Sequence, residues 1–159
     1  MAARPEGSGA ASLPPATFPS VDWFQHLADL MNANRARQEQ LGYVDCVAGF
    51  RVDDADFQVL ITFEEFEVVE VRAPGAGDED LADFVLTGDL ATWREMIESI
   101  VAGNGKPDLE HTLNRLSHMG EPFHVDQDDP LRKDMYFRYN QSFQEFFNAC
   151  SQFDTVFAG

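Results

Sequence analysis

The chain is poor in the residues that build metal centres, disulfide scaffolds and membrane anchors. Its 159 residues include two cysteines, Cys46 and Cys150, and no CxxC pair or Cys/His spacing typical of zinc. Two cysteines over this length predict a reduced, cytoplasmic protein rather than a disulfide scaffold. No stretch approaches the roughly 18 apolar residues of a membrane span, so we expect no stable membrane insertion.

Basic residues are also scarce. Lys and Arg number 11 against 28 Asp and Glu, which gives a formal net charge of −17 at pH 7. A surface with this charge repels phosphate backbones, so we expect no nucleic-acid partner. Acidic excess also keeps a protein soluble, and the charge alone therefore does not identify a function.

The sequence motifs of common enzyme classes are missing too. The chain has no GxSxG, no Walker loop and no GxGxxG. Four side chains remain as weak candidates for acid–base catalysis: Asp83, His111, His118 and Tyr139. Asp83 stands inside an apolar strand, where burial would raise its pKa, although strand alternation favours an outward orientation. His111 and His118 have no third ligand at a metal-binding spacing, so we predict no metal site and no cofactor.

Phenylalanine is the residue that the sequence has in quantity. There are 14 Phe, and hydrophobic residues make up 44% of the chain. This composition predicts a single folded domain with a substantial core. Interiors rich in Phe can line cavities, although ordinary core packing is the simpler explanation.

The segment from Ala82 to Gly103 predicts a strand followed by a helix. An apolar run from Phe84 to Leu86 is typical of a strand, and Asp89 stands where a helix N-cap belongs. Gly103 ends the helix. Between them, apolar residues recur at helical spacing and form one wide face: Leu90, Trp93, Met96, Ile97, Ile100 and Val101.

Similar patterns divide the rest of the chain. Residues 1–19, rich in Ala, Gly, Pro and Ser, predict a disordered tail. Periodicity predicts helices over 21–39 and from Pro107 to Met119, and strands over 44–52, 57–63, 66–72, 82–87 and 122–125. This order of elements predicts an α+β fold in which helices cover one face of a single sheet.

The C-terminal segment predicts one long helix, from about Leu131 to Asp154. Asp129 caps it, and Pro130 takes its first position. An aromatic seam runs along it at spacings of three and four: Tyr136, Tyr139, Phe143, Phe146, Cys150, Phe153 and Phe157. This seam can pack on the sheet, line a pocket or dimerise with a second copy, and the pattern leaves all three open.

The strand that reads ADFVLTG, the following helix with its central Trp93, a Gly-containing turn and a further helix resemble the sterol carrier protein 2-like (SCP2-like) lipid-binding fold. The resemblance extends from about Trp23 to Phe153. It implies an SCP2-like domain over residues 20–159, with a mixed sheet of about five strands and an apolar tunnel between sheet and helices. The long C-terminal helix departs from the family and would cap or narrow that tunnel.

The resemblance also implies a set of ligand-binding residues, which are Trp93, Met96, Ile97, Ile100, Leu113, Leu116, Phe143, Phe146 and Phe147. Three functions follow from the sequence. The first is binding or carrying a hydrophobic small molecule such as a sterol, fatty acid, acyl-CoA or polycyclic compound. The second is a cofactor-independent isomerase or cyclase that uses the same pocket with one of the four acid–base candidates. The third is an interaction module that forms a homodimer through the aromatic seam.

Overall fold

The structure is a computed structural model, and it describes residues 13–78 and 80–158. The first twelve residues of the predicted tail lie outside the described part. The larger elements, in chain order, are α1 (Val21–Asn32), α2 (Arg35–Leu41), β2 (Cys46–Val52), β3 (Phe57–Glu64), β4 (Glu67–Arg72), β5 (Phe84–Gly88), α3 (Leu90–Ala102), α5 (Pro130–Arg138) and α6 (Asn140–Asn148). The shorter ones are β1 (Ala16–Phe18), η2 (Leu109–His111), α4 (Leu113–Leu116), β6 (His124–Asp126), η3 (Ala149–Gln152) and β7 (Thr155–Phe157).

A five-stranded mixed sheet forms the centre of the molecule, in the order β4-β3-β2-β5-β6. β2 pairs in parallel with β5, and the other three pairings are antiparallel. A tight turn joins β3 to β4, with Glu65 in a left-handed conformation at φ 57°. The predicted α+β fold with a single mixed sheet is therefore confirmed.

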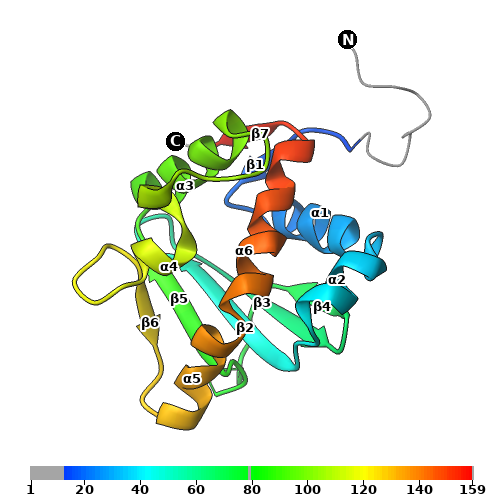
Figure 1. The fold of residues 1–159 in the computed structure, drawn as a ribbon. Helices are drawn as coiled ribbons and strands as arrows, with labels where there is room; N and C mark the ends of the chain where they lie inside the picture. The colour runs from blue at the N-terminus through cyan, green and yellow to red at the C-terminus, as the bar shows by residue number, and fades with distance from the viewer. Residues whose placement is uncertain (1–12, 79, 159) are drawn as a thin grey trace.

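The two faces of the sheet carry different residues. Phe50 on β2 pairs with Val59 on β3 and with Leu86 on β5, and all three side chains are buried on the inner face. Arg51 and Thr87, one position further along, point to the outer face because successive side chains alternate. Helices α1, α3 and α6 gather on the inner face, and α6 (orange in Figure 1) crosses in front of the sheet.

The predicted tail boundary at residue 19 is wrong for its last residues. Ala16–Phe18 forms β1, which pairs in parallel with β7. Phe18 is fully buried, with its ring centroid 4.7 Å from that of Trp23. Trp23 in turn donates a hydrogen bond from Nε1 to Thr155 Oγ1 at 3.0 Å. A composition rich in Pro and Ser did not predict this strand, because the strand has only three residues and its partner lies at the other end of the chain.

The single long C-terminal helix is also a wrong prediction. The helix is interrupted at Tyr139, whose backbone angles of φ −101° and ψ 15° end α5 before α6 begins. α5 contacts β5 and β6, whereas α6 contacts α1, α2 and α4. One straight helix would not follow both surfaces, so the chain bends at Tyr139.

Two further helices are shorter than their periodicity predicts. The helix predicted over 21–39 has a break at Ala33 and Asn34, which divides it into α1 and α2. The helix predicted from Pro107 to Met119 consists of η2 and the four-residue α4. Thr112 explains the second break, because its extended backbone lets its hydroxyl cap α4 by accepting the Arg115 N–H at 3.1 Å.

Candidate functional site

The candidate site is a layer of aromatic side chains between the inner face of the sheet and the helices. We call it the aromatic layer and define it as Phe50, Phe63, Phe84, Trp93, Tyr136, Phe143, Phe146 and Phe147. The ring of Phe143 lies 5.4 Å from that of Phe63 and 5.5 Å from that of Phe84, measured between centroids. Phe147 meets Phe50 edge to face at 5.1 Å. These separations are typical of favourable aromatic pairs.

The structure brings all the predicted ligand-binding residues into one core. α3 supplies Trp93, Met96, Ile97 and Ile100, α4 supplies Leu113 and Leu116, and α6 supplies Phe143, Phe146 and Phe147. None of these side chains is more than 6% exposed. Their role in ligand binding stays a prediction, because burial is equally expected of an ordinary core.

One hydrogen-bonded group interrupts the apolar surroundings where α4, α5 and α6 meet. Tyr136 is fully buried, and its hydroxyl donates to Ser117 Oγ at 2.8 Å. Ser117 Oγ donates in turn to the carbonyl oxygen of Leu113 at 2.5 Å. Burial raises the pKa of Tyr136 to about 12, against smaller opposing effects of Ser117 and Asn140. The hydroxyl therefore keeps its proton at neutral pH.

Sequence reasoning missed this group as a site. The available signal was a Tyr at position 136 in a seam otherwise rich in Phe, because a buried phenol needs a hydrogen-bond partner. Ser117 and Asn140 carried no signal of their own in the sequence.

A surface hollow of about 490 Å³ lies over α6, beside α1 and α2. Met31 and Phe146 are its buried apolar residues, and most of its other lining residues are polar. An ion pair between Arg37 Nε and Glu145 Oε1, 2.6 Å long, joins α2 to α6 there. Through Phe146, this hollow reaches the edge of the aromatic layer.

Two more hollows, of about 730 and 520 Å³, lie on the outer face of the sheet and share Arg51, Gln58 and Pro74. Arg51 already donates to Thr87 Oγ1 and pairs with Asp126, both at 3.2 Å. Their remaining charged groups are mostly aspartates, so nothing in them selects one kind of ligand.

Asp83, the first acid–base candidate, acts as a connector between elements. Its Oδ2 accepts the backbone N–H of Val47 at 2.8 Å, and its own N–H donates to the Val47 carbonyl at 2.7 Å. Arg132 Nε from α5 lies 3.4 Å from its Oδ1. The carboxylate is half-buried and fully engaged in joining β2, β5 and α5.

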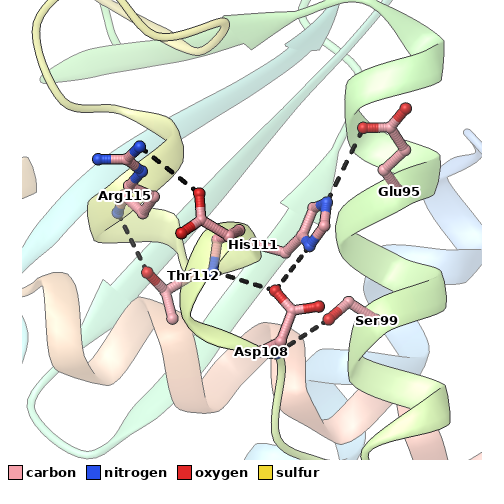
Figure 2. A network of polar contacts seen from close by, with 7 residues as sticks. Glu95, Ser99, Asp108, His111, Thr112 and Arg115 are labelled. Atoms are coloured by element: carbon pink, nitrogen blue, oxygen red, sulfur yellow. Dashed lines mark hydrogen bonds and ion pairs between the residues drawn. The ribbon is translucent and has the colours of Figure 1, made fainter.

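His111, the second candidate, belongs to a polar network that ties the segment after α3 back to that helix (Figure 2). Its Nδ1 lies 2.7 Å from Asp108 Oδ1, and its Nε2 lies 3.9 Å from Glu95 Oε1. The imidazole beside Asp108 holds the pKa of that carboxyl below its usual range. Ser99 Oγ accepts the backbone N–H of Asp108 at 2.9 Å. The His111 ring therefore lies between two carboxylates, and among the described residues neither ring nitrogen has a Ser or Cys side chain as its partner.

The four acid–base candidates do not form a common site. His118 is exposed beyond the end of α4, and Tyr139 lies at the junction of α5 and α6. Within the part of the chain that the structure describes, no hydrogen bond or ion pair joins any two of the four. The same described residues contain no group of three metal-ligating side chains.

The aromatic seam lies within the chain's own core. Tyr136, Phe143, Phe146, Cys150 and Phe153 are each at most 6% exposed. These five side chains are therefore not available to a second copy in this fold. Among the described residues, no helix is long and apolar enough to cross a membrane.

The domain is α+β, with helices and the aromatic layer on one face of a mixed five-stranded sheet. This architecture can be compared with that of known folds. Comparison with solved structures identifies the class of fold: the chain has an SCP2-like fold. No protein-family model matches the chain, and no curated protein does either.

Two solved structures document the likeness, and a third superposes less well. The crystal structure of sterol carrier protein 2 superposes with a TM-score of 0.55 and 19% identity over 82% of this chain and 94% of that one. The conserved hypothetical protein TT1886 from Thermus thermophilus gives 0.52 and 17%, over 88% and 94%. The UbiJ-SCP2 ubiquinone synthesis protein gives 0.43 and 18%, over 75% and 93%. At identities of 17–19%, the first two likenesses show the fold alone.

Proposed function

We propose that the protein binds a hydrophobic small molecule in the aromatic layer. The observation that carries this proposal is the convergence of aromatic side chains from the sheet and from α3, α5 and α6 in one apolar layer. Sites for lipids and polycyclic molecules have this composition, with many apolar walls and few polar groups. The likeness in fold to sterol carrier protein 2 supports the same function.

The charges around the layer favour a ligand without a net charge. The arginines on the covering helices already pair with carboxylates: Arg94 with Glu98, Arg115 with Glu110, and Arg138 with Asp134. An anionic head group would have to compete with these carboxylates, on a chain of net charge −17. A sterol or another polycyclic molecule therefore fits better than a fatty acid or an acyl-CoA.

Binding is expected to rearrange the layer. Because its side chains are already buried, a ligand has to displace some of them rather than enter open volume. α4 is the shortest helix that covers the layer, with four residues, and it contributes Leu113 and Leu116. We expect this helix to move when a ligand enters, since few contacts hold so short an element.

Native mass spectrometry of freshly purified protein, followed by organic extraction, tests the proposal first. The expected result is an added mass that is released as a neutral lipid or polycyclic compound. Adding the extracted compound at 100 times its Kd should stabilise the fold by about 2.7 kcal/mol. For a domain of this size, that corresponds to a rise in Tm of about 5–10 °C.

Two substitutions on α3 form a matched pair for this test. Ile97→Phe places a Phe on the face that points into the core, and Val101→Phe places the same side chain at a position that is 49% exposed. We expect Ile97→Phe to abolish binding and Val101→Phe to leave it intact. A protein that carries no extractable compound, and whose Tm responds to no sterol, polycyclic compound or fatty alcohol, would refute the proposed function.

A further inference from the structure

The aromatic layer has one polar end, formed where α5 and α6 meet α4. The ring of Tyr136 lies 5.5 Å from that of Phe84 on the sheet and is stacked 6.1 Å from that of Phe143. Its hydroxyl points away from the sheet, toward Ser117 and the Leu113 carbonyl. The Leu113 backbone of α4 therefore borders the hydroxyl, and Phe143 borders the ring.

One polar group at this end lacks a hydrogen-bond partner. The Tyr136 hydroxyl donates to Ser117, and the Ser117 hydroxyl donates to the Leu113 carbonyl, so both of these donors are satisfied. Asn140 begins α6 four residues after Tyr136, and its side chain lies close enough to the Tyr136 hydroxyl to lower the pKa of that group. Its Nδ2 is nevertheless buried without a hydrogen bond of normal geometry among the described residues. A buried donor without a partner costs about 1–3 kcal/mol and is rare in folded proteins.

We propose that Tyr136, Ser117 and Asn140 form the polar end of the ligand site and bind one uncharged oxygen, a hydroxyl or a carbonyl, of an otherwise apolar molecule. This inference rests on the proposed function and adds the polar group of the ligand. Asn140 Nδ2 donates to the ligand oxygen. A ligand hydroxyl also donates to a free lone pair on the Tyr136 oxygen, which leaves the bond to Ser117 in place.

A carboxylate does not fit this end. Burial keeps the Tyr136 hydroxyl protonated, and none of the three groups carries a positive charge to pair with an anion. Transferring a carboxylate there would remove its hydration without supplying a counter-charge, which is strongly unfavourable. The geometry therefore separates alcohols and ketones from the corresponding acids.

The test compares ligands that share a skeleton and differ only in their oxygen. The ring series is 5α-cholestane, 5α-cholestan-3-one and 5α-cholestan-3β-ol, and the chain series is hexadecane, hexadecan-2-one and hexadecan-1-ol. Each is delivered from cyclodextrin, and its affinity for the full-length protein is measured from the rise in Tm with ligand concentration. In at least one series, we expect the ketone and the alcohol to bind about tenfold more tightly than the hydrocarbon, which corresponds to about 1.4 kcal/mol.

Asn140→Leu is the decisive variant, and Asn114→Leu on the exposed side of α4 is its control. Asn140→Leu should reduce the affinity for ketone and alcohol to that of the hydrocarbon, without lowering the Tm of the free protein. Tyr136→Phe should weaken the alcohol more than the ketone, with Tyr139→Phe as its control. Should Tyr136→Phe fail to fold, the Asn140 comparison still decides the question.

The outcomes separate this inference from the proposed function. Binding of hydrocarbon, ketone and alcohol with equal affinity by the unmodified protein would overturn the polar end and leave the proposed function standing. The polar end would also be overturned if Asn140→Leu lowered the affinity for the hydrocarbon as much as the affinity for the alcohol. Failure of both series to bind at all would overturn the two together.

Discussion

Gly88, at the junction of β5 and α3, has no room for a side chain. A Cβ at this position would overlap Cδ1 of the Phe123 ring, and it would lie 2.6 Å from Cε1 of the same ring. The backbone there is held from β2, because Gly88 pairs with Val52 and its carbonyl accepts the Asp53 N–H at 3.0 Å. We therefore expect Gly88→Ala to displace the Phe123 ring rather than the strand.

The size of the effect follows from the packing of Phe123. Its ring is 2% exposed, and its centroid lies 4.5 Å from that of Trp93, so it has little freedom to move. Adding a methyl group to a tightly packed site costs about 1–3 kcal/mol. We expect Gly88→Ala to lower the free energy of unfolding by about 2 kcal/mol, and Tm by about 4–8 °C.

Urea denaturation of a double-mutant cycle tests the steric explanation. In a Phe123→Leu background the smaller side chain leaves room for the methyl group, so Gly88→Ala should cost less than about 0.5 kcal/mol there. Gly75→Ala serves as the control, because the nearest atom to its added Cβ is Asp78 Oδ2 at 3.5 Å. An equal cost of Gly88→Ala in both backgrounds would show that contact with Phe123 is not the cause.

Three further predictions concern charge and thiol chemistry. Hydrogen bonds from Thr92, first from its side chain and then from its backbone N–H, hold the pKa of Asp89 below its usual range. Its contribution to stability is therefore complete above the unfolded pKa of about 4 and is lost as the pH falls through the lower folded value. Asp89→Asn should reduce the loss of Tm between pH 5 and 2, as followed by circular dichroism. Burial raises the pKa of Cys150 to about 12 and also raises that of Cys46, so Ellman's reagent should label neither thiol before the protein unfolds. Glu145→Gln should cost no more than about 1 kcal/mol, because the ion pair with Arg37 is partly exposed, and the difference from the unmodified protein should shrink in 1 M salt.

The elements with both a periodic pattern and an end signal could be predicted from the sequence. α3 begins after Asp89, whose carboxylate accepts the Thr92 N–H at 2.9 Å, and it ends before Gly103 as predicted. The start of α1 follows the same logic, because Ser20 Oγ accepts the Trp23 N–H at 3.1 Å. Caps are local interactions within a few residues, so the sequence contains the whole signal.

Breaks inside a periodic pattern could not be predicted in the same way. The aromatic spacing continues through Tyr139 without a Gly or Pro, yet the backbone bends there, because α5 and α6 follow different surfaces. The direction of those surfaces is set by the sheet, which is distant in sequence. A pattern within one helix carries no information about it.

The pairing of β1 near the N-terminus with β7 near the C-terminus could not be predicted from nearby residues either. β1 and β7 have three residues each, and each is a strand only because the other lies beside it. Their separation in sequence is nearly the whole chain, and a pair of three-residue strands is not stable alone. Burial of Phe18 against Trp23 supplies the stability that their few hydrogen bonds lack.

For the candidate site, the sequence predicted the apolar walls but missed the polar end. Helical spacing is enough to select residues such as Ile97 and Phe143 for the interior, since a buried face repeats every three or four positions. Ser117 and Asn140 lie on either side of a contact between α4 and α6, and no spacing within one element brings them together. Only the tertiary structure shows that both lie beside Tyr136, which bonds to Ser117.

The position of the proposed polar end is the feature that an ordinary core explains least well. A core that serves stability alone would gain from Phe at position 136 and from an apolar residue at 140, because both changes remove polar atoms from an apolar interior. Instead, among the residues that the structure describes, Asn140 has an unpaired donor there, next to α4, the four-residue helix that we expect to move when a ligand enters. Two hydrogen bonds join α4 and its C-cap residue Ser117 to the neighbouring helices, from Leu113 N–H to Gln144 on α6 and from Tyr136 on α5 to Ser117. An oxygen that enters beneath α4 would therefore satisfy Asn140 at the point where the layer opens most easily.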